Sequence, residues 1–190
     1  MIETHLPVLQ IVVPLIAAPI CLLLRQRHLV WAFSVLVSAC TMVIAAQLLV
    51  EVLEHGVLSY AVGGWSPPWG IELRIDVVNA FVLLLVGLIA TIVLLYAPAS
   101  VGAEIAKRHQ TLFYTAYLLC LTGLLGIAAT GDAFNLFVFL EISSLSSYAL
   151  ISMGKDRRAL TAAYQYLVMG TIGATFILIG VGLMYMMTGT

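Results

Sequence analysis

Charged side chains are scarce in this chain of 190 residues. They make up 9% of the sequence, against 63% for hydrophobic side chains, whereas soluble domains average about 25% charged residues. This composition excludes a soluble globular core and predicts a multi-pass membrane protein. The net charge of −1 leaves no basic field that would attract nucleic acid.

Metal-ligand and disulfide patterns are also missing. The three cysteines, Cys21, Cys40 and Cys120, fall inside apolar runs, no two of them form a C-x-x-C pair, and no histidine lies at ligand spacing from them. We therefore expect no disulfide, no metal site and no cofactor. The N-terminus lacks the basic segment and cleavage pattern of a secretory signal, so the first apolar run is predicted to be a retained helix.

Apolar runs long enough to cross a bilayer, about 20 residues each, occur six times. They cover residues 6–24, 29–50, 77–97, 111–130, 132–153 and 160–187. Pro98 is expected to end the third run, and glycines in the sixth indicate close contact with another helix. The predicted fold class is an all-α integral membrane protein of about six transmembrane helices.

One connection, residues 51–76, is long. It holds several turn-forming residues, two tryptophans suited to the lipid headgroup region, Trp65 and Trp69, and an alternating stretch at 71–75 that predicts a short strand or extended segment. Four acidic residues lie in or beside it: Glu51, Glu54, Glu72 and Asp76. They either form a merely solvated loop or concentrate cations.

The basic residues predict the orientation. If the N-terminus is outside, the outer loops hold only Arg74, and the inner loops hold the other seven of the eight Lys and Arg residues. These seven are Arg25, Arg27, Lys107, Arg108, Lys155, Arg157 and Arg158. Because cytoplasmic loops carry an excess of basic residues, we predict an outside N-terminus in a multi-pass protein of the cell (inner) membrane.

Glu141 is the exception to the placement of charges. It lies near the middle of the fifth run, whereas all other charged groups lie at the edge of a run or between runs. A carboxylate at membrane depth costs about 2.5 kcal/mol or more even on lenient insertion scales. Such a residue indicates a proton or ion path, and the alternative is a structural ion pair.

Hydroxyl groups share the predicted face of Glu141. On a helix, positions three, four and seven residues apart lie on one face, which selects Ser144, Tyr148 and Ser152. Three further serines, Ser143, Ser146 and Ser147, widen this stripe. The stripe is interpreted as a proton path toward the basic end of the helix, although serines also serve as small contacts between transmembrane helices. Asp132 is predicted to cap the fifth helix, the alternative being a direct role in ion transfer.

The sequence resembles a known family at three places. The string GDAFNLFVFLEISSLSSYALI resembles the fifth transmembrane helix of the proton-translocating antiporter-like subunits, which include the D-type subunits of Mrp sodium/proton antiporters and membrane-arm subunits of NADH–quinone oxidoreductases. The segments GGWSPPWGIELRIDVVNAF and AAYQYLVMGTIGATFILIGVGLMYMMTGT resemble the outer loop before the third helix and the sixth helix of that family. Within the family, these segments are most similar to the D-type Mrp branch.

The resemblance implies a mechanism and a set of partners. Members carry two inverted five-helix repeats with broken helices near the midplane. The glutamate of the fifth helix, which Glu141 matches, pairs with a lysine on the broken seventh helix, and protons move along a water chain as the pair opens and closes. Other membrane subunits, the lipid bilayer, protons and Na⁺ are the implied partners.

The chain departs from the family pattern in two respects. It stops at Thr190, so the broken seventh helix with its lysine and the second repeat are absent. We therefore expect an incomplete reading frame or a piece of a split subunit. Alone, such a piece is expected to translocate nothing. Gln165 stands where many relatives have a lysine; Gln165 and Lys155 are possible relay positions. Residues 1–110 then form an N-terminal three-helix segment with outer loop 51–76, and residues 111–190 form the first three helices of an incomplete repeat.

Three functions remain open at this point. The first is the N-terminal part of a monovalent cation/proton antiporter component, which is a transporter and not an enzyme. The second is a proton-pumping membrane component of a respiratory or hydrogenase-type redox complex; no redox motif is present in the chain itself. The third is a membrane scaffold without transport, in which Glu141 would be dispensable and the glycines of the sixth helix would not.

Overall fold

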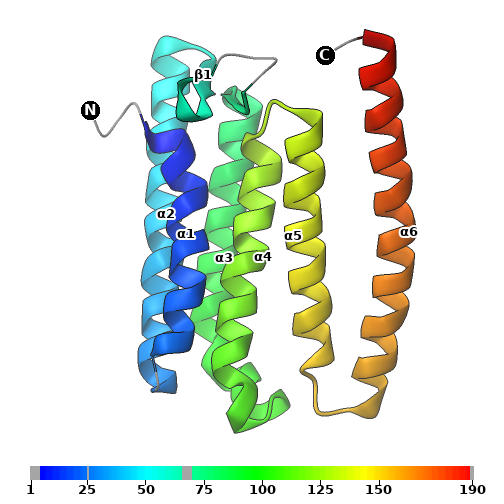
Figure 1. The fold of residues 1–190 in the computed structure, drawn as a ribbon. Coiled ribbons are helices and arrows are strands. Elements are labelled where there is room, and N and C mark those ends of the chain that lie inside the picture. The colour runs from blue at the N-terminus through cyan, green and yellow to red at the C-terminus, as the bar shows by residue number, and fades with distance from the viewer. Residues whose placement is uncertain (1–4, 25, 66–69, 189–190) are drawn as a thin grey trace.

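A computed structural model describes residues 5–24, 26–65 and 70–188; Arg25 and Trp69, which entered the predictions above, lie outside the described residues. Six helices run up and down the molecule, each long and apolar enough to cross a membrane (Figure 1). The six predicted spans are thereby confirmed. The helices are α1 (Leu6–Leu23), α2 (Arg27–His55), α3 (Val77–Glu104), α4 (Gln110–Ala129), α5 (Ala133–Ser152) and α6 (Arg157–Thr188).

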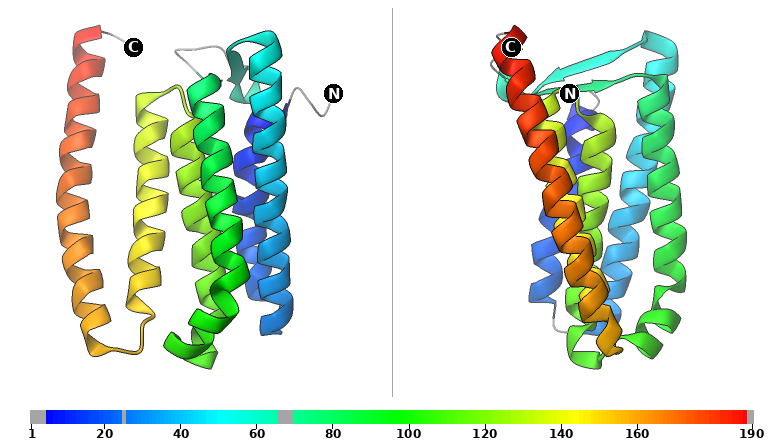
Figure 2. Two further views of the ribbon diagram at one scale, coloured as in Figure 1. Left: turned by 180° about the vertical axis from the view of Figure 1, so that it is seen from behind. Right: turned by 90° about the vertical axis from the view of Figure 1, so that its right-hand side faces the viewer.

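The first four helices form a cluster around a common core. Helix α1 packs on α2 and α4, and α3 packs on the same two helices. Fully buried leucines fill the space between them, among them Leu48, Leu83, Leu94 and Leu118. Helix α5 lies against α4, and α6 lies beyond it against α5 (Figures 1 and 2). The molecule is therefore a four-helix cluster with two further helices added on one side.

Helix α3 does not end at Pro98 as predicted but continues to Glu104. A proline has no backbone N–H, so Pro98 leaves the carbonyl of Leu94 without its helical partner. The indole Nε1 of Trp31 on α2 donates a hydrogen bond to that carbonyl at 2.8 Å. A donor from the neighbouring helix replaces the missing bond, which is one of the ways by which membrane helices tolerate proline.

The predicted loop 51–76 is shorter in the structure, because α2 continues to His55. The prediction ends the span at the first charged residue, because only the apolar part crosses the bilayer. Glutamate is a good helix former, however, so the helix continues through Glu51 and Glu54 beyond its apolar part. After the helix, strand β1 (Leu58–Ala61) pairs antiparallel with strand β2 (Glu72–Ile75). The strand predicted at 71–75 is thus confirmed, whereas its partner β1 was not predicted.

Contacts tie the helix connections together at each end of the molecule. At one end, the free edge of β2 meets the α4–α5 turn: the N–H of Gly131 donates to the carbonyl of Glu72 at 2.9 Å, and Leu73 bridges Thr130. The other end joins the α3–α4 and α5–α6 connections through Lys155. Its backbone N–H donates to the Glu104 carbonyl at 3.2 Å, and its Nζ donates to the Ala103 carbonyl at 2.5 Å; Ile105 and Gly154 form a bridge there.

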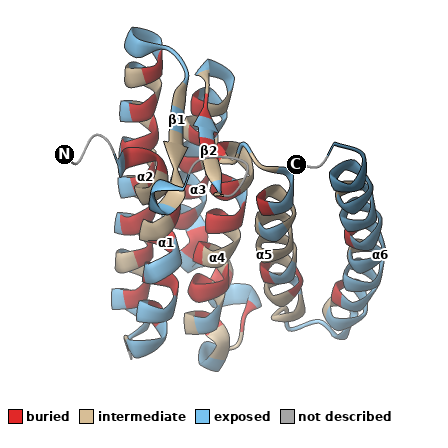
Figure 3. Ribbon diagram, turned by 45° about the horizontal axis from the view of Figure 1, so that its top comes forward, coloured by how far each residue is buried: buried red, intermediate tan, exposed pale blue. Residues whose placement is uncertain are grey.

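Helix α6 is the most exposed of the six helices (Figure 3). Its buried residues are Ala163 and Ala174. A Cβ built on Gly170 would collide with Tyr148 of α5, whereas Cβ atoms on Gly173, Gly180 and Gly182 would meet nothing within 4 Å. Of the described glycines in α6, Gly170 alone has the predicted close contact with another helix.

Candidate functional site

Glu141 lies near the middle of α5 and is half-buried. Within the described part of the chain, its carboxylate has no hydrogen bond and no ion pair. The structural ion pair considered as an alternative is therefore not formed by the described residues. Glu141 thus lies in the middle of a helix long and apolar enough to cross a membrane, and it has no charged partner in the described part of the chain.

Two glycines of α4 determine how α5 faces its neighbour. A Cβ on Gly123 would lie 2.6 Å from the backbone nitrogen of Ser143, and a Cβ on Gly126 would collide with the ring of Phe139. The two helices thus touch along the face of α5 that carries Phe139 and Ser143. Glu141 is two residues from each of them, which is about 200° round a helix of 3.6 residues per turn. Its side chain therefore points away from α4.

The face of Glu141 is directed toward α6. Tyr148, two helical turns from Glu141 and on the same face, is 9% exposed. Its ring makes an edge-to-face contact with Tyr166, with the ring centroids 5.0 Å apart, and its hydroxyl lies against Gly170. Ser144 and Ser152 lie on this face by helical spacing. Of the residues predicted to form the proton path, Tyr148 contacts α6, and Ser152 donates a hydrogen bond to the Ala149 carbonyl of its own helix at 2.8 Å.

Two of the serines expected to widen this path bond within α5. Ser146 is 7% exposed and donates to the Ile142 carbonyl at 2.7 Å. Ser147 donates to the Ser143 carbonyl at 2.9 Å and lies 3.5 Å from the sulfur of Cys120 on α4. Both hydroxyls donate to carbonyls of their own helix, and Ser147 lies at the α4–α5 contact.

Neither possible relay residue lies beside Glu141. Lys155 is fourteen residues along the chain and lies beyond the end of α5, and its Nζ is bonded to the Ala103 carbonyl. Gln165 is exposed on α6. Since Tyr148 is level with Gly170 in this antiparallel pair, Gln165 is level with the last turn of α5, far from Glu141.

Asp132 occupies the N-cap position of α5. Its carboxylate accepts hydrogen bonds from the backbone N–H groups of Phe134 at 3.3 Å and Asn135 at 3.1 Å. The side-chain amide of Asn135 in turn donates to the hydroxyl of Thr130 at 3.0 Å. These bonds satisfy orphan N–H groups at the start of the helix, and they fix the turn that precedes the site.

Three residues were not predicted from the sequence: two glycines that position α5, and one polar side chain buried within a helix that could cross a membrane. Gly123 and Gly126 set the face that α5 presents, and their three-residue spacing is the only signal that could have found them. Gln10 of α1 is completely buried, and neither its side-chain nitrogen nor its oxygen has a partner among the described residues. It was missed because it carries no charge.

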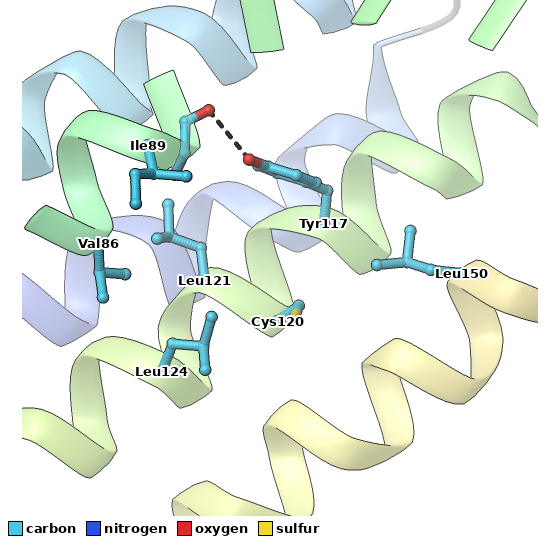
Figure 4. A pocket seen from close by; sticks show the side chains of 8 residues that line it. Val86, Ile89, Tyr117, Cys120, Leu121, Leu124 and Leu150 are labelled. Atoms are coloured by element: carbon cyan, nitrogen blue, oxygen red, sulfur yellow. Dashed lines mark hydrogen bonds between the residues drawn. The ribbon is translucent and has the colours of Figure 1, made fainter. Parts of the chain in front are cut away.

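A cavity of about 290 Å³ between α3, α4 and α5 lies apart from the Glu141 face (Figure 4). Apolar side chains line most of it, and the hydroxyl of Tyr117 is turned to the carbonyl of Ala90, to which it donates at 2.9 Å. No carboxylate or basic group lines the cavity. Among the described residues there is also no cluster of His, Cys, Asp and Glu that could hold a metal ion.

Comparison with known proteins agrees with this architecture. Residues 130–190, which contain α5 and α6, match the family described as "NADH:quinone oxidoreductase/Mrp antiporter, TM". The N-type subunit of the NADH-quinone oxidoreductase of Desulforudis audaxviator is 44% identical over 189 residues, covering 98% of this chain and 37% of that protein. The D-type subunit of the Na(+)/H(+) antiporter of Bacillus subtilis is 33% identical over 184 residues, covering 96% and 37%.

Two solved structures contain chains with the same fold. One is the membrane-bound sulfane sulfur reductase, an archaeal respiratory membrane complex, with a TM-score of 0.90 and 35% identity over 98% of this chain and 38% of that chain. The other is the Mrp complex from Dietzia sp. DQ12-45-1b, with a TM-score of 0.87 and 25% identity over 100% and 35%. This chain therefore spans a little over one third of the length of the relatives that it matches.

The fold and these similarities define a multi-pass membrane protein with part of an antiporter-like fold. The chain matches the NADH:quinone oxidoreductase/Mrp antiporter family over residues 130–190. It corresponds to the N-terminal portion of a protein similar to the D-type subunits of Mrp antiporters and the N-type subunits of NADH–quinone oxidoreductases.

Proposed function

We propose that this chain is part of a multisubunit monovalent cation/proton antiporter, and that Glu141 carries protons within the membrane. One observation supports the proposal above all others: Glu141 is half-buried in the middle of α5, faces away from the helix on which α5 packs, and has no partner among the described residues. A chain keeps such a costly carboxylate where it exchanges protons or ions.

The hydroxyls on the same face continue the route. Ser144 and Tyr148 can each donate and accept a hydrogen bond, and Ser152, whose hydroxyl donates to the Ala149 carbonyl at 2.8 Å, can accept one. Neighbours in this line are separated by three or four residues, which is about 5–6 Å along the helix, so that direct bonds between them are too long. Water molecules between the hydroxyls complete the chain of hydrogen bonds along which a proton moves from Glu141 toward the basic end of α5.

The proposal assigns the charged partner of Glu141 to a segment outside the described residues. Lys155, the lysine nearest to Glu141 along the chain, lies beyond the end of α5 and is bonded to the Ala103 carbonyl. Other membrane subunits of the assembly, Na⁺ and protons are the proposed partners. Conversion of an electrochemical gradient then requires the complete assembly.

A second candidate function is favoured by the similarities themselves. The identity to the oxidoreductase subunit of Desulforudis audaxviator, 44%, exceeds the identity to the antiporter subunit of Bacillus subtilis, 33%. In a redox-driven complex the same Glu141 would pump protons, with electron transfer as the energy source. Copurification of iron–sulfur or flavin subunits with this chain from native membranes supports that candidate, and their absence from an active assembly supports the antiporter.

The experiment that tests the role of Glu141 compares three variants in the complete assembly: E141Q, E141D and the control E51Q, which changes a carboxylate at the end of α2. Sodium-dependent proton movement is followed in inverted membrane vesicles with a pH-sensitive dye. We expect E141Q to lose the activity, E141D to keep part of it and E51Q to match the unmodified protein. Full activity of E141Q at equal abundance would contradict the proposal and favour a scaffold role.

A further inference from the structure

A second cavity, of about 180 Å³, lies at the basic end of the molecule between the start of α2, the end of α3 and the start of α4. Arg27 and His28 form part of its lining and are both exposed. Neither side chain has a hydrogen bond or an ion pair within the described residues. The carboxylate-bearing residue at this end of α3, Glu104, is not among the residues that line the cavity.

The lining also contains a tyrosine whose ring is buried and whose hydroxyl has no partner among the described residues. Tyr114 of α4 is only 4% exposed and lines the cavity. Within the described part of the chain, its hydroxyl makes no hydrogen bond. Because this hydroxyl is accessible from the cavity, it can donate a hydrogen bond to a group held there.

The electrostatics of the cavity favour an anion. Helix α2 begins beside it with Gln26 at the N-cap position and no side-chain cap, so that its first backbone N–H groups are free. The positive end of the helix dipole attracts negative charge. Arg27 and His28 add donors at the same place. An anion with several acceptor oxygens, such as a phosphate group, satisfies this arrangement, and the volume is well above the ~30 Å³ that a water molecule occupies.

The surroundings of the cavity match a lipid molecule. The indole of Trp31 lines it, and tryptophan is enriched at the headgroup level of membranes. Toward the middle of the bilayer, Leu95 of α3, which is 58% exposed, lies one turn from Pro98. It provides an apolar surface for an acyl chain below a phosphate.

We propose that this cavity binds the phosphate headgroup of an anionic phospholipid, with Arg27, His28 and the Tyr114 hydroxyl as the recognising groups. Basic pockets between transmembrane helices bind such headgroups in other membrane proteins. The site is on the opposite side of α4 from α5, and it is independent of the role assigned to Glu141.

The test uses the full chain purified in detergent and depleted of lipid. Phosphatidylglycerol is titrated, and bound lipid is counted by native mass spectrometry. We expect at least one retained phosphatidylglycerol, bound more tightly than phosphatidylcholine. R27Q is expected to weaken this binding about fivefold, and Y114F is expected to weaken it without any change of charge. The control R158Q removes a basic residue at the same end that does not line the cavity, and it should bind as the unmodified chain does.

Three outcomes would overturn the proposal. Equal binding of phosphatidylglycerol and phosphatidylcholine would show that the phosphate charge is not recognised. An equal loss in R27Q and R158Q, with no effect of Y114F, would indicate diffuse surface attraction in place of a site. Complete displacement of the lipid by millimolar inorganic phosphate would show that the cavity takes a free anion. Circular dichroism of each variant confirms that the helices are retained.

Discussion

The hydroxyl of Tyr148 on α5 lies directly against Gly170 on α6, where no other residue type fits without movement. We expect G170A to destabilise the protein by about 1–2 kcal/mol, because a methyl group added to a filled contact forces neighbouring groups apart. Thermal unfolding in detergent measures the effect. The control G173A adds the same group where nothing lies within 4 Å and should cost nothing.

The same contact allows a double-mutant test. In Y148F the hydroxyl is absent, and a ring carbon at 2.9 Å remains the nearest obstacle to a Cβ at position 170. The variant carrying both Y148F and G170A should therefore recover part of the stability lost in G170A alone. If the two losses simply add, the close approach of the two helices is not as described.

The contact between α4 and α5 is expected to be less tolerant. In G123A the new methyl group would lie 2.6 Å from a backbone nitrogen of Ser143, and a backbone cannot move aside as a side chain does. We expect a loss of about 2–3 kcal/mol and a rotation of α5 that alters the direction of Glu141. Thermal unfolding checks the first effect, and cysteine crosslinking between α5 and α6 checks the second. G180A, at an open position, should leave both measurements unchanged.

The Trp31–Leu94 hydrogen bond predicts a reciprocal pair of substitutions. W31F removes the donor and leaves the Leu94 carbonyl unpaired beside Pro98, at a cost of about 1–3 kcal/mol for a buried acceptor. P98A restores a backbone N–H at the position that normally serves this carbonyl. The double variant should therefore be more stable than W31F. A W65F control, on an exposed tryptophan, should resemble the unmodified protein in the same unfolding assay.

The cap of α5 gives a smaller effect. D132A removes the acceptor of the Phe134 and Asn135 N–H groups and should lower stability by about 1 kcal/mol. D132N keeps an oxygen at the same place and should lose little, because asparagine is an equally good N-cap residue. A loss of the same size in both variants would indicate that the charge of Asp132, and not its hydrogen bonds, is what the helix requires.

The six spans and the line of Glu141, Ser144 and Tyr148 were predictable because they depend on local rules. Lipid requires an uninterrupted apolar length, and a helix places residues three and four apart on one face. Both rules act within a single segment, so one stretch of sequence contains all the information. The strand at 72–75 was accessible for the same reason, from its alternating pattern.

The features that could not be predicted depend on two distant segments at once. The continuation of α3 through Pro98 needs an indole that is supplied from α2. The direction of Glu141 on α5 depends on two glycines of the neighbouring helix α4, which contact Ser143 and Phe139. Pairing between helices is decided by shape complementarity of small residues, which a single segment does not show.

The bridges at the two ends of the molecule have a consequence for biogenesis. Because β2 is joined to the α4–α5 turn, the two connections must emerge in the same compartment, and the intervening α3 and α4 must cross the bilayer an even number of times. Lys155 imposes the same parity on the connections at the opposite end. A single impermeant label at one accessible position, for example on a cysteine introduced at Ser59, would therefore establish the sidedness of every connection between helices at once.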